Sequence, residues 1–294
     1  MKKIFLSVVA VFLGFIAVGQ DDVVVVDSYW KNDTIKLKFT QIGSTNNVSV
    51  QKIGNNDGEK PTGILVIPSR ISVEGDTTIY TVTEIASGGF DEVHGLSKVT
   101  IPNTVTKIGD NAFRHSGNNS TSFEIIMSEN IKEIGASAFE GCNKLLSIEL
   151  REGLEKIGSS AFASCNGITE IIFPSTLDTL GASAFATCNN LSTLKFNSWV
   201  SIGANAFQNC SKLGVITGPC GLSLSDIGVS LHDTVTSNYA SNCMLITKKD
   251  GAFNDEDTWG VDDMYVFNTN DRMIRSIDTV TIPDGFSLDI SGSN

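Results

Sequence analysis

Residues that carry catalysis or bind polyanions are scarce in this chain. Only three of its 294 residues are histidines, and none of the three belongs to a shared motif. No Gly-x-Ser-x-Gly, His-Glu-x-x-His or phosphate-cradling glycine loop occurs, so we predict that the protein is not an enzyme and binds no cofactor or metal. Lysine and arginine number 21 against 33 acidic residues, a formal net charge of −12. This charge argues against nucleic acid and anionic membranes as partners.

Long apolar runs are also missing, except at the N-terminus. There Met1-Lys2-Lys3 precedes an apolar stretch from Ile4 to Val18, followed by small residues that suit a cleavage site. The stretch is shorter than the about 20 residues of a membrane-spanning helix, and it has the form of a secretory signal peptide. We predict a signal peptide over residues 1–19, cleaved near Gly19 and Gln20. The mature chain would then be secreted or displayed on the cell surface without membrane insertion, an uncleaved anchor being the alternative.

What the chain does contain is a repeated six-residue motif, Ile-Gly-Ser-Ser-Ala-Phe at its third full copy. Five full copies and one degraded copy follow each other at intervals of 23, 26, 23, 23 and 22 residues. A period in the low twenties is typical of a solenoid, in which each repeat buries its apolar face only against its neighbours. The copies occupy residues 85–90, 108–113, 134–139, 157–162, 180–185 and 202–207.

Each repeat predicts the same local structure. Ile171 and Phe173 alternate with exposed positions, so we expect a strand there that pairs in parallel with its neighbours about 4.8 Å away. Pro174 would end that strand. Gly158 would lie at a corner of the chain, a place that favours a residue without a Cβ. The phenylalanines that close the motif would stack in an internal column, formed by Phe113, Phe139, Phe162, Phe185 and Phe207.

Four of the six cysteines recur in register with the repeats, at Cys142, Cys165, Cys188 and Cys210. Val93 and Ser116 hold the same place in earlier turns, which indicates a small buried position. Stacked turns would hold neighbouring Cβ atoms about 4.8 Å apart, whereas a disulfide needs about 3.8 Å. We therefore predict buried free thiols. Cys220 and Cys243 lie off register, and a bridge between them stays open.

The repeat consensus, Leu-x-x-Ile-x-Ile-Pro-x-x-Val-x-x-Ile-Gly-x-x-Ala-Phe-x-x-Cys, resembles the BspA-like leucine-rich repeats of secreted and surface proteins of Bacteroidetes-type bacteria. The resemblance covers about residues 61 to 230. Ser87-Gly88-Gly89 departs from the motif, and the pattern decays after Cys210. The resemblance implies a leucine-rich-repeat solenoid, export, and a role in adhesion or protein binding. It implies no catalytic residues.

These features predict a repeat solenoid with β-rich caps at both ends. We expect an N-terminal β cap over residues 20–60, a leucine-rich-repeat array of parallel strands and short turns over 61–230, and a β-rich region over 231–294. That last region contains short strand patterns from Met244, Tyr265 and Asp278 onward, and we interpret it as an incomplete domain of a longer protein.

Two further segments carry alternatives. The interval of 26 residues contains an insertion at residues 115–121, which we interpret as a tolerated surface loop, a binding loop being the alternative. An acidic cluster surrounds Trp259 at residues 255–257 and 262–263. It lacks a calcium-loop spacing and is interpreted as a solvated loop.

The outward side of the predicted strands is the candidate binding face. Ile126 and Ile172 would be exposed apolar residues there, which can mark a contact surface, although an inert sheet is the alternative. We predict non-catalytic binding of an extracellular protein or glycan, in the adhesion class. The alternative is a structural spacer that carries a C-terminal module. The ten residues of the candidate face are Lys98, Thr100, Glu124, Ile126, Ser147, Glu149, Glu170, Ile172, Thr193 and Lys195.

Overall fold

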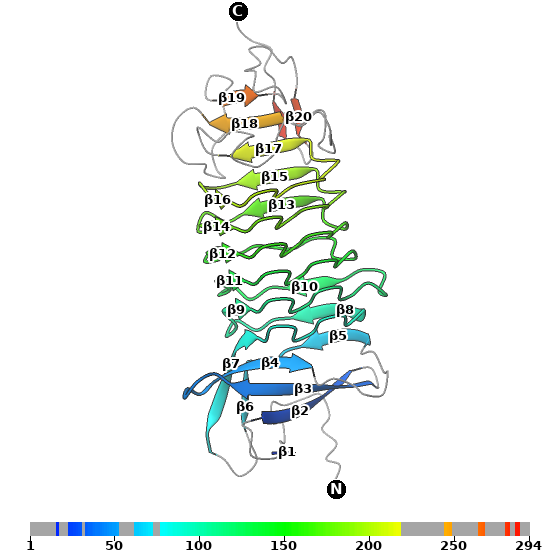
Figure 1. The fold of residues 1–294 in the computed structure, drawn as a ribbon, viewed down its shortest axis with the longest axis vertical. Coiled ribbons are helices and arrows are strands. Elements are labelled where there is room, and N and C mark those ends of the chain that lie inside the picture. Colours follow the sequence, from blue (N-terminus) through cyan, green and yellow to red (C-terminus); the bar gives the residue numbers. More distant parts are fainter. Residues whose placement is uncertain are drawn as a thin grey trace, which may run out of the picture.

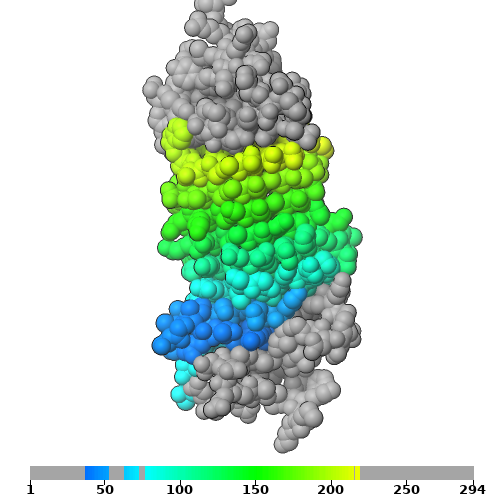
Figure 2. Space-filling model, viewed as in Figure 1, coloured from blue at the N-terminus to red at the C-terminus, as the bar shows by residue number. Residues whose placement is uncertain are grey.

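The computed structural model describes residues 16–17, 23–30, 33–52, 62–72 and 77–218, and four short strands beyond them. The described chain winds into stacked coils along one long axis (Figure 1), and the coils form successive bands in the space-filling view (Figure 2). Before and at the start of the coils lie β1 (Ile16–Ala17), β2 (Val23–Trp30), β3 (Asp33–Gln41), β4 (Asn47–Lys52), β5 (Thr62–Val66), β6 (Arg70–Ser72) and β7 (Ile79–Ile85).

The repeats contribute the next ten strands. They are β8 (Gly95–Thr100), β9 (Lys107–Ile108), β10 (Glu124–Ile126), β11 (Glu133–Ile134), β12 (Lys156–Ile157), β13 (Glu170–Phe173), β14 (Thr179–Leu180), β15 (Thr193–Phe196), β16 (Ser201–Ile202) and β17 (Val215–Gly218). The strands beyond the repeats are β18 (Met244–Lys248), β19 (Met264–Phe267), β20 (Val280–Ile282) and β21 (Phe286–Leu288). The strands predicted near Met244, Tyr265 and Asp278 are thereby confirmed.

Each coil has three segments. One is a strand of what we call the split sheet, which consists of a three-stranded block β10-β8-β5 and a five-stranded block β13-β15-β17-β18-β19. The second is a two-residue strand of the long sheet, in which β4, β7, β9, β11, β12, β14 and β16 follow each other. The third runs from the motif glycine through the phenylalanine to the cysteine, and we call the stack of these segments the turn column. The predicted solenoid with a period near 23 is confirmed, since Ile134 pairs with Ile157 and Ile157 with Leu180.

The two-residue strands of the long sheet differ from the prediction of one strand per repeat. They end on the first apolar residue of the motif, which is buried in β9, β11, β12 and β14. The residue before it carries charges that alternate from coil to coil: Lys107, Glu133 and Lys156 lie in register, with Lys–Glu nitrogen–oxygen distances of 3.4 and 3.2 Å. Opposite charges on adjacent coils thus help to define the register.

The predicted aromatic column is confirmed and is one ring longer. Six phenylalanine rings stack with centroid separations of 5.3, 5.4, 5.2, 5.0 and 5.8 Å and planes within 13° of parallel. Each is buried, so each contributes about 1.5–3 kcal/mol through the hydrophobic effect. The degraded first copy of the motif supplies the sixth ring. The column consists of Phe90, Phe113, Phe139, Phe162, Phe185 and Phe207.

The motif glycines serve a different purpose from the one predicted. A Cβ at Gly181 would lie 2.4 Å from the backbone carbon of Gly158 in the preceding coil, and a Cβ at Gly158 would lie 2.5 Å from the nitrogen of Ala136. Neither glycine has a left-handed backbone. The requirement is therefore the close approach of successive coils, because the glycine hydrogen leaves room that a methyl group would fill.

Left-handed backbone occurs instead at two other places in each coil, where the residues are mostly serine or asparagine. One place is two residues after the motif glycine, as at Ser160 (φ 56°), and the other is two residues after the phenylalanine, as at Ser164 (φ 60°). Asparagine tolerates this conformation better than most residues. These turns let the segment fold into the tight turn column. The other non-glycine members are Glu92, Asn111, His115, Ser137, Ser183, Thr187, Asn205 and Asn209.

Hydrogen bonds between coils in the turn column all run in one direction. The N–H groups of Asn111, Phe113 and His115 donate to the carbonyl oxygens of Ala136, Ala138 and Glu140 in the next coil, over 2.7–2.8 Å. The same three bonds recur at each of the five junctions between successive motif copies, with nitrogen–oxygen distances of 2.6–3.0 Å. Each coil thus offers carbonyls toward the N-terminal end and N–H groups toward the C-terminal end.

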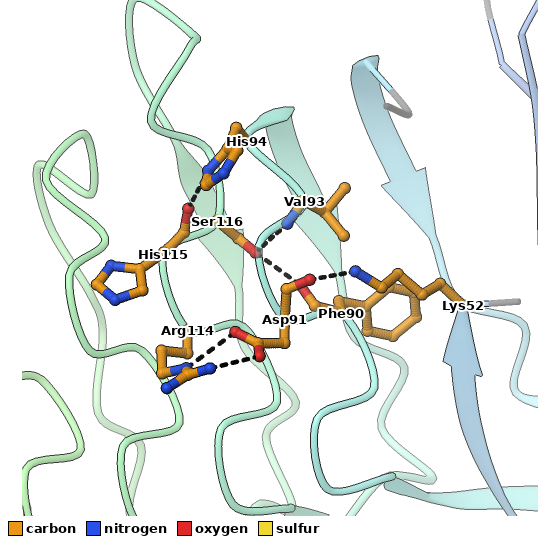
Figure 3. A network of polar contacts seen from close by, with 8 residues as sticks. All are labelled: Lys52, Phe90, Asp91, Val93, His94, Arg114, His115 and Ser116. Atoms are coloured by element: carbon orange, nitrogen blue, oxygen red, sulfur yellow. Dashed lines mark hydrogen bonds and ion pairs between the residues drawn. The ribbon is translucent and has the colours of Figure 1, made fainter. Parts of the chain in front are cut away.

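Lys52, the last residue of β4, covers the first coil. Its backbone N–H donates to the carbonyl of Gly89 over 2.8 Å, and its ammonium group donates to the carbonyl of Asp91 (Figure 3). Burial lowers the pKa of Lys52, against the charges of Asp91 and Glu92 that raise it. β4 also pairs in parallel with β7. The predicted cap over residues 20–60 includes residues outside the described part of the chain, so its extent stays a prediction.

The split sheet is interrupted at one coil. Residues 146–150 form no strand, although the repeat pattern predicts one, and they separate β10 from β13 (Figure 1). Phe123 and Ile125 lie two residues apart on β10 and its approach, whereas Leu145 and Ile148 lie three apart. Phe123 and Leu145 form an isolated bridge, and beyond it the two segments are out of step by one residue. The interruption therefore follows from unequal spacing in neighbouring coils.

Candidate binding face

The outward side of the split sheet carries the predicted face. Lys98 pairs in register with Glu124, and Glu170 pairs with Thr193 in the second block. The next outward positions place Thr100 beside Ile126 and Ile172 beside Lys195. The prediction that Ile126 and Ile172 are exposed is confirmed, with 41% and 46% of their surface accessible.

Two apolar residues of the face were missed. Ile64 and Val66 on β5 are 40% and 54% exposed, and they pair with Lys98 and Thr100. The signal was present, because Ile64 to Pro68 has the same alternation that marks the later strands. That stretch stands before the first motif copy, so the period did not point to it.

Ser147 and Glu149 differ from the prediction in one respect. Both are exposed, but they lie on the interrupted segment 146–150 and not on a strand. Leu146 beside them is 54% exposed. Their place over the middle of the split sheet is retained, because the long sheet runs without a break through β11, β12 and β14. Their role in binding stays a prediction.

Charged side chains on the face are partly tied down. The ammonium of Lys98 lies 3.0 Å from a carboxylate oxygen of Glu124, and the guanidinium of Arg151 lies 2.5 Å from that of Glu149. Such exposed pairs contribute at most about 1 kcal/mol each, so an approaching ligand can replace them at small cost. Glu170 is exposed and has no ion pair with any residue in the described part of the chain. The face therefore mixes isoleucine and glutamate side chains.

The insertion at residues 115–121 takes part in an asparagine ladder along one edge of the coils. The Asn118 amide donates to the carbonyl of Gly141 over 2.9 Å, and its oxygen accepts from the N–H of Asn143 over 2.9 Å. Asn166 donates from its side chain to Asn143 over 2.8 Å and accepts from the N–H of Asn189 over 3.0 Å. The insertion thus extends a structural contact to one further coil.

A polar network lies beside the first two coils (Figure 3). The guanidinium of Arg114 binds both carboxylate oxygens of Asp91, at 3.0 and 2.8 Å. Nδ1 of His94 lies 2.7 Å from the carbonyl oxygen of His115, and the buried Ser116 hydroxyl donates to the carbonyl of Phe90 over 2.7 Å. These contacts join backbone to side chains across coils. They explain the positions of two of the three histidines by structure.

The cysteine column repeats the bond made by Ser116. The thiol of Cys142 donates to the carbonyl of Phe113 over 3.0 Å, and each later thiol makes the same contact, at 3.0–3.2 Å, with the phenylalanine two motif copies earlier. Burial raises the pKa of Cys142 and of Cys210 to about 12. The predicted buried free thiols are confirmed at these four positions. Cys220 and Cys243 lie outside the described residues.

Other site types were also sought. Within the part of the chain that the structure describes, no group of three or more His, Cys, Asp or Glu side chains is arranged to hold a metal ion. The acidic cluster around Trp259 lies outside that part. The described residues include no helix long and apolar enough to span a membrane.

Three solved structures resemble this fold. A leucine-rich repeat protein from Bacteroides ovatus is 26% identical with a TM-score of 0.52, over 62% of this chain and 45% of that one. The T. pallidum leucine-rich repeat protein is 22% identical with a TM-score of 0.51, over 62% and 82%. A leucine-rich cell surface protein from Faecalibacterium prausnitzii is 24% identical with a TM-score of 0.48, over 62% and 52%. The chain thus spans less than half the length of the B. ovatus protein.

A family model supports the same assignment. No curated protein matches the chain. The model of the BspA type leucine-rich repeat region matches in six copies, over residues 76–125 and 118–232. These copies include every motif of the turn column and the strands of both sheets in the repeats. The chain belongs to the BspA-type leucine-rich-repeat family.

Proposed function

We propose that this protein binds an extracellular protein or glycan without catalysis, through the outward side of the split sheet. The observation that carries the proposal is the set of exposed aliphatic side chains there, on strands whose opposite side is fully packed. Exposed aliphatic residues on a rigid sheet lose little conformational entropy on binding, which favours their use as contacts. Membership of a repeat family supports binding as the general role.

Secretion or surface display belongs to the same proposal. It rests on the signal-peptide pattern of residues 1–19 and on the net charge of −12. A reporter fused after residue 60 and followed by cell fractionation tests it. Export with removal of about 19 residues supports the proposal, and retention of the whole chain in the cytoplasm contradicts it.

The binding role is tested with the full chain on immobilised extracellular matrix proteins and glycans. Ser147→Arg places a long cation on the proposed face, whereas Ser159→Arg places the same side chain on the turn column. Both serines are exposed, so both variants should fold. We expect binding to fall about tenfold or more for Ser147→Arg, a cost of about 1.4 kcal/mol, and to be unchanged for Ser159→Arg. Equal effects would contradict use of this face.

A second measurement separates this proposal from the spacer alternative. The chain lacking residues 242–294 should bind as the full chain does if the split sheet is the contact surface. Loss of all binding on that deletion would favour a C-terminal module carried by a structural array. Turnover of a bound glycan or peptide, abolished by one substitution, would contradict the non-catalytic role.

A further inference from the structure

The exposed aliphatic residues of the split sheet form one row along the solenoid axis. Val66 pairs with Thr100, and Thr100 pairs with Ile126. Ile126 precedes the buried Ile134 of β11 by eight residues, and Ile172 precedes the buried Leu180 of β14 by eight. Because β11, β12 and β14 pair in unbroken register, Ile126 and Ile172 occupy the same row two coils apart.

The spacing of this row is regular. Its aliphatic members stand on alternate coils, and coils are about 4.8 Å apart, so Val66, Ile126 and Ile172 are separated by about 9.6 Å each. The coils between them place Thr100 and Glu149 in the row. A ligand that touches all three aliphatic side chains must present an apolar group at about the same interval.

A second row repeats with the first. Glu124-Ile125-Ile126 and Glu170-Ile171-Ile172 are identical tripeptides two coils apart, each with its glutamate and second isoleucine outward. The face therefore offers two copies of one pair, a carboxylate beside an aliphatic side chain. A complementary ligand carries a basic residue beside each apolar one, at the same interval.

The interval distinguishes between ligand conformations. A polyproline II helix has three residues per turn and a rise of about 3.1 Å, so it presents the same side every 9.3 Å or so. An extended β-strand presents the same side every two residues, about 6.7 Å. An α-helix repeats after seven residues, about 10.5 Å, and is almost 2 Å out of step after two intervals. Only the first conformation matches all three aliphatic positions.

We propose that the split sheet binds a basic segment in the polyproline II conformation, lying parallel to the solenoid axis. Every third side chain of the segment is apolar and contacts Val66, Ile126 and Ile172. The neighbouring side chain in each triplet is lysine or arginine and pairs with Glu124 and Glu170. The negative charge of the chain, −12, favours approach of such a segment. This inference rests on the proposed function and specifies its partner.

The test uses a labelled nonapeptide of three Pro-Leu-Lys units and the full-length chain, with binding followed by fluorescence anisotropy. We expect saturable binding that weakens with added salt. A peptide of the same composition in scrambled order, an alternating Leu-Lys peptide and a Pro-Leu-Glu peptide should each bind at least about tenfold more weakly. Equal binding of the scrambled or alternating peptide would overturn the inference.

Variants of the protein locate the contact. Ile126→Ser and Ile172→Ser should each weaken binding about fivefold, the effect of about 1 kcal/mol of lost apolar contact. Glu170→Gln should weaken binding of the Lys peptide and reduce its salt dependence. Leu146→Ser is the matched control, because Leu146 is equally exposed but lies off the row. A loss as large for Leu146→Ser as for Ile126→Ser would contradict the proposed row.

The outcome is independent of the broader proposal. Binding of matrix proteins that Ser147→Arg weakens, together with no binding of the Pro-Leu-Lys peptide, would overturn this inference and leave the proposed function standing. Absence of both would overturn both. Association of the chain with itself through this face, measured by sedimentation and abolished by Ile126→Ser, would name a second copy as the occupant and also overturn the inference.

Discussion

At the scale of single residues, the coils are held at a distance that excludes some side chains altogether. Gly181 lies directly against the backbone of the preceding coil, with no space for a Cβ. Gly214, by contrast, has no atom closer than 3.7 Å to the place a Cβ would take. The two glycines look alike in the sequence, since both end a run of repeat residues. Only the packing of neighbouring coils separates them.

Gly181→Ala should therefore destabilise the fold while Gly214→Ala should not. A methyl group 2.4 Å from backbone atoms forces coils apart, and overpacking of this kind costs about 1–3 kcal/mol or more. Urea unfolding followed by circular dichroism measures the difference. A midpoint for Gly181→Ala equal to that of Gly214→Ala would show that the coils can separate without cost.

The buried thiols predict a loss of stability at high pH. Folding raises the pKa of Cys142 to about 12, from about 8.5 in an unfolded chain. The contribution of the neutral thiol is therefore complete below pH 8.5 and is lost as the pH rises toward 12, by up to about 1.4 kcal/mol per pH unit. Cys142→Ser removes this term and keeps a donor like that of Ser116. Under reducing conditions, its unfolding free energy should fall less between pH 8 and 10.5 than that of the parent; an equal fall would contradict the argument.

At the scale of elements, the interruption at residues 146–150 divides the split sheet into two blocks. The long sheet and the turn column pass this coil without a break, so only one of the three segments of the coil is loosened. A strand without a paired neighbour opens more easily than one in a continuous ladder.

Hydrogen exchange should detect this difference. Backbone amides of residues 147–150 should exchange faster than those of 171–173 by roughly two orders of magnitude, as expected for about 3 kcal/mol less local opening free energy. Mass spectrometry of peptides that cover each segment measures the rates. Equal protection of the two segments would mean that the interrupted coil is as firmly paired as β13.

Much of the array could be predicted from the sequence, because the period fixes which residues stack. The order of the phenylalanine column, the free thiols and the exposure of Ile126 and Ile172 follow from register alone. Two features could not be predicted. Two-residue strands such as β12 are too short for alternation to mark them. The loss of the strand at 146–150 depends on a one-residue difference between Phe123 and Ile125 in the coil before it, which a consensus pattern averages away.

At the scale of the whole molecule, the array behaves as a stack of exchangeable coils. Each coil contacts only its two neighbours, so its stability is the sum of coil and junction terms. Removing residues 158–180 joins Ile157 to Gly181 and restores the motif. Phe139 then faces Phe185, and Lys156 faces Ser201, so no like charges meet.

We expect the chain without residues 158–180 to fold, with a lower but still cooperative unfolding transition. Removing residues 158–169 instead joins Ile157 to Glu170 and destroys the period, and that variant should not fold. Circular dichroism and urea unfolding compare the two. Cooperative folding of both, or of neither, would contradict a stack of independent coils.

The one-way hydrogen bonds of the turn column also make the molecule electrically polar. Fifteen aligned peptide groups of about 3.5 debye each sum to a dipole of roughly 50 debye along the axis. Its negative pole lies at the first coil, where the ammonium of Lys52 compensates it. Its positive pole lies at the N–H groups of Asn205, Phe207 and Asn209, which donate to none of the described residues. The column therefore has a head and a tail, and a further coil can be added only in the same orientation as the rest.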